Sequence, residues 1–463
     1  MAGHGAVLMT EGPIWKRVLS FALPILLGNL FQQLYNVVDS LVVGNFTGKA
    51  ALAAVSSSSH LILLLVGLIS GIFIGAGVVI ARYYGAGAEG QVSTAVHTTV
   101  AFALISGIAL TVCGVGLTPS ILRLMGTPEN VLPDSILYFR IYFSGVLFMA
   151  LYNTVNGILQ AMGDSRHPLY YLITAAVLNA ILDILFVAGL NWGVAGAGAA
   201  TVIAQGFSAF LGLRHLMRVE GAHRLIPRNI HLNRPMLREI LQMGLPSGLQ
   251  SSIIALANTV MQSNINSFGE DAMAGCGSYM KIEGFAFLPV TTFALAMTTF
   301  ISQNLGARQY DRARRGARFG MAASMLLSEL IGMLIYFLSP YLIALFNSDS
   351  AVVAVGVAQA RTMAPFYFLL AFTHSISGTL RGAGLAVVPM GVMVVCWCVI
   401  RVSYVTLILR FFNDIRCIFL GYPLTWSLSC IVLAIYFWKA DWLHHFDRQA
   451  HSDGPQTPQK RDG

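Results

Sequence analysis

Long apolar runs limit the folds open to this chain more than any other feature. Twelve runs are long enough for the roughly 20 residues that a helix needs to cross a bilayer. Only 10% of the 463 residues are charged, against roughly 25% in soluble domains. The sequence therefore predicts an all-α polytopic membrane protein with twelve transmembrane helices. They are expected at residues 16–44, 52–81, 94–117, 134–162, 169–190, 193–217, 236–266, 272–302, 316–345, 351–380, 387–411 and 414–438.

Basic residues predict the orientation of these helices. With twelve crossings, 20 of the 28 Lys and Arg residues fall on one side of the membrane, and 11 of these 20 lie in two dense clusters at 214–238 and 308–318. Basic residues favour the cytoplasmic side, so both termini are expected there. The net charge of +8 then reflects topology and gives no reason to expect nucleic-acid binding.

An internal repeat predicts two lobes. Three pairs of segments recur 221 or 222 residues apart: SFALP and QMGLP (ending at Pro24 and Pro246), IARYYGAG and ISQNLGAR (containing Gly85 and Gly306), and NGILQAMGDSRHP and SGTLRGAGLAVVP (starting at Asn156 and Ser377). Six helices per repeat give both halves the same topology, a parallel repeat whose substrate site is expected between the lobes. The expected parts are an amino-terminal lobe at 12–217, a cytoplasmic linker at 218–235, a carboxy-terminal lobe at 236–438 and a polar cytoplasmic tail at 439–463 that is anchored by Trp442 and otherwise disordered.

Two prolines occupy matching places in the first and seventh predicted helices. Proline removes one helix hydrogen bond and bends the helix. A static bend that helps packing is the simpler interpretation of Pro24 and Pro246. A hinge that moves during function is the alternative.

Ionisable residues inside apolar spans usually mark ion or proton pathways because a charge in hydrocarbon is costly. Only four acids lie well inside the spans: Asp39, Asp183, Glu283 and Glu329. We expect Glu329 to be neutralised by Arg401 in a structural ion pair. Glu283 is a candidate second functional acid, although a structural role is equally compatible with its position.

Oxygen-bearing side chains accompany two of these acids. Asn179 lies four residues before Asp183, so both occupy one helix face. Carboxylate, amide and hydroxyl oxygens suit a small cation or a shared proton. The alternative for the uncharged members is hydrogen bonding between helices. The predicted cation or proton site comprises Asp39, Asn179, Asp183 and Thr201, where Na+ would bind, with Asn153 and Asn156 nearby.

Other polar and aromatic residues could line a substrate cavity, although most such residues in spans simply pack. The candidates are Gln32, Tyr35, Asn36, Met261 and Gln262. The segment GNFTGK, at 44–49, lacks the spacing and the Ser/Thr of a phosphate loop. Neither hydrolase motifs nor clustered Cys and His ligands stand out in the sequence. We therefore expect neither an enzyme nor an organic cofactor.

The combination of motifs resembles one known family. TEGPIWKRVLSFALPILLGNLFQQLYNVVDSLVVG, the paired FALP and GLP segments, ARYYGAG with SQNLGAR, and KIEGFAFLP are similar to the multidrug and toxic compound extrusion (MATE) family over about residues 10–438. The resemblance implies two six-helix lobes that rock to export cationic or amphipathic small molecules in exchange for Na+ or H+. It also implies a multi-pass protein of a prokaryotic plasma membrane, acting as a monomer without nucleotide or nucleic acid.

The resemblance also implies functional residues. One prokaryotic branch holds its cation with an acid on helix one, Asn and Asp on helix five and Thr on helix six, which map to Asp39, Asn179, Asp183 and Thr201. Helix one of that branch bends near the proline that corresponds to Pro24. Another branch has an acid on helix seven, and this chain has none between 247 and 269.

One alternative function belongs to the same superfamily. A lipid-linked saccharide flippase would share the helices and lobes, and such proteins line their cavity with basic residues. Only Arg381 and Arg401 lie near the spans of the carboxy-terminal half, which disfavours a flippase.

Overall fold

The computed structural model describes residues 8–46, 67, 69–124, 129 and 132–452. For residues 35–46, 124, 134, 188, 194 and 449–452 it describes the backbone alone. Helices are the regular elements of the described residues, joined by turns and short irregular segments, and no strand occurs among these residues.

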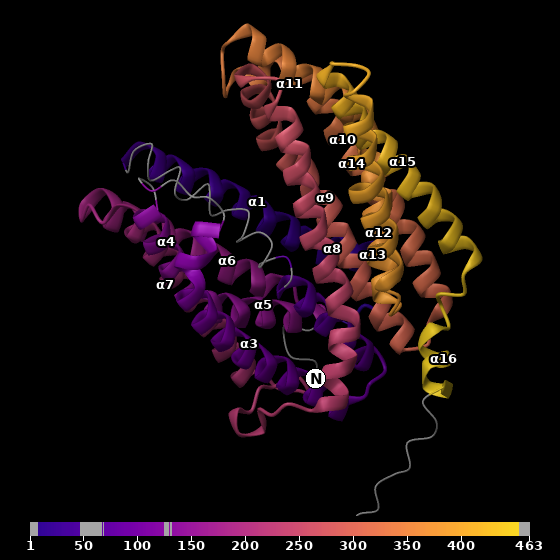
Figure 1. Ribbon diagram of the computed structural model, residues 1–463. Helices are drawn as coiled ribbons and strands as arrows, with labels where there is room; N and C mark the ends of the chain where they lie inside the picture. The colour runs from indigo at the N-terminus through magenta and orange to yellow at the C-terminus, as the bar shows by residue number, and fades with distance from the viewer. Residues whose placement is uncertain (1–7, 47–66, 68, 125–128, 130–131, 453–463) are drawn as a thin grey trace, which may run out of the picture.

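The amino-terminal half forms the first group of helices in Figure 1. They are α1 (Ile14–Phe46), an unlabelled helix (Ile69–Gly85), α3 (Glu89–Leu124), α4 (Leu132–Ser144), α5 (Val146–Ala161), α6 (Arg166–Asp183), the π-helical segment η1 (Ile184–Gly189) and α7 (Gly193–Arg218).

The carboxy-terminal half forms the second group. It contains η2 (Pro227–Asn229), α8 (Arg234–Asn266), α9 (Glu270–Gly306), α10 (Tyr310–Ala344), α11 (Ser350–Met363), η3 (Ala364–Phe366), α12 (Tyr367–Gly382), α13 (Val387–Met393), the π-helical segment η4 (Val394–Ile400), α14 (Arg401–Ile408), α15 (Ile415–Lys439) and α16 (His445–Ser452).

Most of these helices are long and apolar enough to cross a membrane. The described residues contain ten such spans, or eleven if the pair α4 and α5, bent by 44°, counts as one. The shorter apolar helix Ile69–Gly85 overlaps the second predicted span, whose first part lies outside the described residues. Large apolar side chains on the outer surface, such as Leu326 and Phe337 of α10, are more than 60% exposed, which suits contact with lipid. The structure confirms an all-α polytopic membrane protein.

The two halves form two lobes, and the core of each lobe also takes in one helix of the other half, α8 in the amino-terminal core and α1 in the carboxy-terminal core. One core joins the helix Ile69–Gly85 to α3, α5 and α7, and another joins α9 to α10, α12 and α15. In Figure 1 the lobes converge at the face that carries α16 and the α7–α8 connection, and diverge toward the opposite face. The fold therefore has the two lobes that the repeat predicts.

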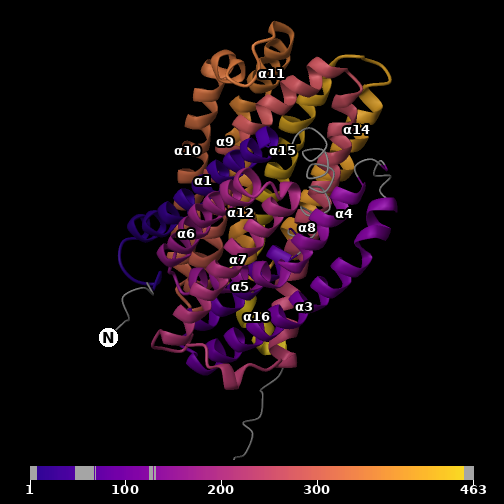
Figure 2. The same cartoon turned by 90° about the vertical axis from the view of Figure 1, so that its left-hand side faces the viewer.

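Helix α1 connects the lobes in a way that the sequence did not predict. Its first turns place Val18, Phe21 and Ile25 in the carboxy-terminal core beside Phe293 and Met297. Farther along, α1 packs on α6 as well as on α9. Figure 2 shows α1 crossing the molecule obliquely beside α6. The helix thus leaves one lobe and continues along the other.

Small residues let the lobes approach closely along the helix Ile69–Gly85. A Cβ atom added to Gly71 would lie 2.1 Å from the backbone nitrogen of Gly248 in α8. One added to Gly75 would lie 2.3 Å from the backbone nitrogen of Gly244. Since real Cβ contacts are longer, only glycine permits this backbone contact.

A second close contact follows the internal repeat. A Cβ atom on Gly85 would lie 2.0 Å from the backbone oxygen of Gln303, and one on Gly306 would lie 2.0 Å from that of Arg82. Arg82 and Gln303 are repeat-related, as are Gly85 and Gly306. The two halves therefore meet through a reciprocal contact, which we call the glycine closure.

An ion pair reinforces the glycine closure. The Arg82 guanidinium pairs with the Glu239 carboxylate at the start of α8. The Tyr83 hydroxyl donates to the other oxygen of Glu239 at 3.0 Å. Polar contacts between lobes thus lie at the face where the lobes converge.

The prediction that Trp442 anchors the tail agrees with its burial, whereas the predicted disorder of the rest is wrong for the described part, which forms α16. Helix α16 follows directly after Trp442 and Leu443, which are buried in the carboxy-terminal core. The Tyr310 hydroxyl donates to Asp447 at 2.6 Å. These contacts offset the cost of ordering a polar segment.

Candidate functional site

A cavity of about 710 Å³ lies between the lobes. Side chains from α1, α5 and the helix Ile69–Gly85 line one wall, and side chains from α8, α9, α11, α12, η4, α14 and α15 line the other. Its volume falls within the range of pockets that enclose small molecules.

The two walls differ in chemistry. The described polar residues of the amino-terminal wall are uncharged: Asn29, Ser70, Asn153, Asn156 and Gln160. The carboxy-terminal wall adds the charged residues Glu283, Arg381 and Arg401, along with His374, to the aromatic residues Phe287, Trp397, Tyr422 and Trp426. The amides of the amino-terminal wall can both donate and accept hydrogen bonds, so they suit many orientations of a ligand. The charged residues of the carboxy-terminal wall can select ligands by their charge.

Arg401 is the most deeply buried of the charged lining residues. It is only 2% exposed, and its Nε donates to the Thr425 hydroxyl at 3.0 Å. The guanidinium carbon lies 4.4 Å from the ring centroid of Tyr422 and 5.3 Å from that of Trp397. Cation–π contacts of this kind hold the planar guanidinium in a fixed orientation.

Glu283 belongs to a buried hydrogen-bond chain. The Tyr279 hydroxyl donates to Glu283 Oε1 at 3.4 Å and lies 2.5 Å from the Tyr367 hydroxyl. These hydrogen bonds join α9 to α12. Glu283 therefore lines the cavity and also belongs to the polar interior of the carboxy-terminal lobe.

The predicted pairing of Glu329 with Arg401 is wrong. Glu329 Oε2 accepts a hydrogen bond from the backbone N–H of Phe368 at 3.1 Å, where α12 begins after η3. Within the described part of the chain no ion pair joins it to Arg401. The acid accepts a main-chain donor at the start of a helix, and the arginine lines the cavity.

The predicted cation site is spread over several helices. Asn179 and Asp183 are each 1% exposed on α6, and the π-helical segment η1 begins immediately after Asp183. Thr201 lies on α7, which packs against α6, and donates to the Ala197 carbonyl at 3.0 Å. Irregular helical turns of this kind are frequent at functional sites. The α1 backbone includes Asp39, but its side chain lies outside the described residues.

Asn153 and Asn156, the other members of the predicted site, line the cavity from α5. Asn153 also donates to the Met149 carbonyl at 2.9 Å. Both amides therefore belong to the wall of the cavity between the lobes.

The predicted cavity residues lie in different environments. Gln262 lines the cavity, whereas Met261 is fully buried in a core with Cys276 and Phe419 and does not line it. Gln32 is partly buried on α1. The side chains of Tyr35 and Asn36 lie outside the described residues. The neighbours Met261 and Gln262 differ because consecutive helical residues point about 100° apart.

The two prolines lie inside continuous helices. Pro24 is within α1 and Pro246 within α8. Pro24 directly precedes Ile25 of the carboxy-terminal core, and a Cβ on Gly28 would contact Leu172 of α6 at 3.4 Å. It therefore marks the point where α1 passes from one lobe to the other.

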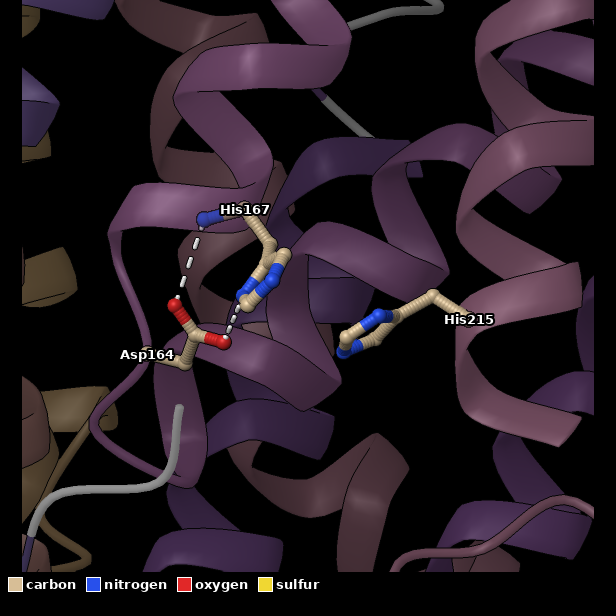
Figure 3. A group of neighbouring side chains, drawn as sticks. All are labelled: Asp164, His167 and His215. Atoms are coloured by element: carbon tan, nitrogen blue, oxygen red, sulfur yellow. Dashed lines mark hydrogen bonds and ion pairs between the residues drawn. The ribbon is translucent and has the colours of Figure 1, made fainter. Parts of the chain in front are cut away.

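A group of possible metal ligands was missed in the sequence. Potential ligand atoms of Asp164, His167 and His215 lie within 4.8 Å of one another (Figure 3). Asp164 Oδ1 accepts hydrogen bonds from the backbone N–H groups of Arg166 and His167, and Oδ2 lies 2.5 Å from His167 Nδ1. These contacts make Asp164 the residue that closes the turn before α6, and they occupy both of its oxygens.

Sequence comparisons place the chain among known transporters. The MatE family model matches residues 24–185 and 246–407, so each match begins at one of the two prolines. A "Probable multidrug resistance protein" of Bacillus subtilis is 29% identical over 439 residues, which cover 92% of this chain and 94% of that protein. A FAD transporter of Shewanella oneidensis is 25% identical over 359 residues, 75% of this chain and 77% of that protein.

Structural comparison agrees on the fold. A MOP superfamily transporter from Pyrococcus furiosus has a TM-score of 0.88 at 22% identity, over 98% of this chain and all of that chain. An outward-facing multidrug resistance MATE family transporter has the same score and identity over the same shares.

Proposed function

Because the chain belongs to the MatE family of transporters, we propose that it exports amphipathic small molecules, including cationic ones, in exchange for Na+ or H+. The observation that carries this proposal is the cavity between two repeat-related lobes, with polar and aromatic residues on its walls. Glu283 is the described carboxylate in that cavity and would receive a positively charged group.

The coupling ion would act on the acids of the amino-terminal lobe. In the proposed cycle a cation or proton from outside neutralises Asp39 and Asp183 and removes the cost of holding their charges in a low-dielectric interior. Helix α1 then bends at Pro24 and substrate leaves outward. Rocking of the lobes releases the ion inward and reloads substrate. Linkage requires that ion and substrate weaken each other's binding.

The orientation in the membrane is part of the proposal. We place the face with the glycine closure in the cytoplasm of a prokaryotic cell, because the basic clusters at 214–238 and 308–318 adjoin it. Both termini would then be cytoplasmic, and the protein would act as a monomer in the plasma membrane.

Transport in proteoliposomes tests the function. Purified protein is reconstituted with a fluorescent amphipathic substrate, and efflux is followed under a pH gradient alone and then under a Na+ gradient alone. We expect one of the two gradients to drive transport above that of protein-free vesicles. Absence of transport under both would contradict antiport.

Export of a lipid-linked saccharide is the second candidate function. The structure places both Arg381 and Arg401 on the cavity wall, and basic residues there would suit a pyrophosphate. One similar protein is a FAD transporter. Another is the MOP superfamily transporter from Pyrococcus furiosus, whose binding pocket is described as having a reverse polarity that suggests a different function for that protein. Movement of a labelled lipid between leaflets without a gradient would favour the flippase.

Replacement of Pro24 tests the hinge. The Pro24→Ala protein regains a backbone donor that can bond within α1, and such a bond contributes about 1 kcal/mol. This favours the straight helix by about fivefold, so we expect gradient-driven transport to slow by about that factor. Pro119→Ala in α3, also a helix-interior proline, is the matched control. Unchanged transport by Pro24→Ala protein would make the bend purely structural.

A further inference from the structure

The charges on the cavity wall point to a substrate property that the sequence did not predict. Among the described lining residues, two carry positive charge, Arg381 and Arg401, and Glu283 alone carries negative charge. A purely cationic ligand would add a second uncompensated positive charge to this space. An anionic group would compensate the excess.

Arg401 has donor capacity left for a ligand. A guanidinium has five N–H donors, and here Nε is bonded to Thr425. The Nη2 atom is buried and has no hydrogen-bond partner among the described residues. A buried N–H donor without a partner is destabilising, so a ligand oxygen that reaches Nη2 would be bound strongly.

The charged neighbour on the same wall does not use this donor. Glu283 accepts from the Tyr279 hydroxyl, and no ion pair between Glu283 and Arg401 occurs in the described part of the chain. Arginine binds carboxylates and phosphates through paired N–H groups. The unpartnered Nη2 of Arg401 therefore matches an anion.

Aromatic rings extend the wall away from Arg401. The Trp397 ring lies 5.5 Å from the ring of His374, which lies 6.5 Å from the ring of Phe287. His374 and Arg381 are seven residues apart on α12, so they lie about 10 Å apart along the helix axis. The rings of Trp397, His374 and Phe287 form what we call the aromatic row. It offers flat surfaces to a ligand between the basic groups of Arg401 and Arg381.

We propose that the cavity binds an amphipathic substrate with an anionic group, a carboxylate or a phosphate, that the Arg401 guanidinium holds while the aromatic row receives the apolar body. The proposal rests on the proposed export function, since it names the substrate class of the same cavity. Arg381 provides a second basic group for a substrate with a further negative charge.

Two flavins that differ by one phosphate test the proposal. Binding of riboflavin and of flavin mononucleotide is measured on the purified full-length protein in detergent, by quenching of flavin fluorescence. We expect flavin mononucleotide to bind at least tenfold more tightly than riboflavin. Equal affinity would overturn the proposal, and so would tighter binding of cationic rhodamine 6G than of anionic fluorescein. This comparison needs no variant, so it does not depend on how a mutant folds.

Variants assign the preference to Arg401. Arg401→Gln is expected to weaken flavin mononucleotide binding at least tenfold more than it weakens riboflavin binding. Arg401→Lys keeps the charge without the planar fork and is expected to be intermediate. Arg410→Gln, which removes the same charge after the end of α14 and outside the cavity lining, should retain the preference. A preference that survives Arg401→Gln would overturn the assignment.

The phosphate could come from a soluble molecule or from a lipid. Lysophosphatidic acid is therefore tested beside flavin mononucleotide, and Arg401-dependent binding of either supports the proposal and identifies the source. Binding of neither overturns it. Binding is measured in detergent without an ion gradient. Failure of ion-driven transport in vesicles would therefore contradict the proposed function, whereas only the binding measurements decide whether Arg401 holds an anionic group.

Discussion

Asp183→Asn protein is expected to bind substrate with the weakened affinity of the ion-bound state and to lose ion-driven transport. Coupling free energies between sites are typically about 1–3 kcal/mol, or about 5–150-fold in affinity, and removal of the titratable charge should abolish most of this. We expect a transport rate lower by about 5–150-fold under whichever gradient drives transport by the parent protein. The measurement is efflux from proteoliposomes.

The reason lies in the position of Asp183. It is 1% exposed on α6, immediately before a π-helical segment, and it does not line the cavity. The amide preserves shape and cannot become charged. Substrate affinity in detergent should therefore match that of the parent protein with its ion bound, and it should no longer fall when Na+ or protons are added.

An acid from the other lobe provides the control. Glu329 also lies within a membrane span, but it bonds a backbone N–H and does not line the cavity. Glu329→Gln keeps an acceptor oxygen and should transport at the parent rate. Full transport by Asp183→Asn under the driving gradient would contradict the assigned coupling site.

Gly306→Ala is expected to prevent closure of the face where the lobes converge. The added methyl group would lie 2.0 Å from the Arg82 carbonyl oxygen, and this neighbour is backbone that cannot rotate away. Overpacking costs about 1–3 kcal/mol, which shifts a conformational equilibrium by about 5–150-fold. Transport should fall by a similar factor, because alternating access requires this face to close.

Hydrogen exchange distinguishes this effect from general destabilisation. Amides of residues 80–86 and 300–308, which flank the glycine closure, should exchange faster in Gly306→Ala protein, while those of the lobe cores should not. Gly85→Ala should have the same effect on exchange, because the contact of Gly85 with Gln303 is the repeat-related counterpart of the contact of Gly306 with Arg82. Gly277→Ala, on the same helix α9 with nothing within 4 Å of its added Cβ, is the control. Parent-like exchange and transport in Gly306→Ala would refute this role.

The sequence predicted the lobes correctly because the signals are local or periodic. Apolar runs report each span by themselves, and the repeat spacing survives in any conformation of the chain. Side-chain pairing was harder to predict. An ion pair between Glu329 and Arg401 was predicted. In the structure Glu329 instead accepts a hydrogen bond from a backbone N–H, and Arg401 lines the cavity. Spans that are apolar on nearly all sides do not show which face points inward.

The sequence by itself determined the membrane class, the repeat, the family resemblance and the short set of acids inside the spans, since burial of a charge in an apolar run is visible without a fold. Tertiary structure alone decided that α1 crosses between lobes, that Gly85 and Gly306 meet backbone atoms of the opposite half, and that two arginines line the cavity. Those properties depend on how helices distant in sequence are rotated and packed against one another, and the amino-acid order of one helix does not specify its rotation against another.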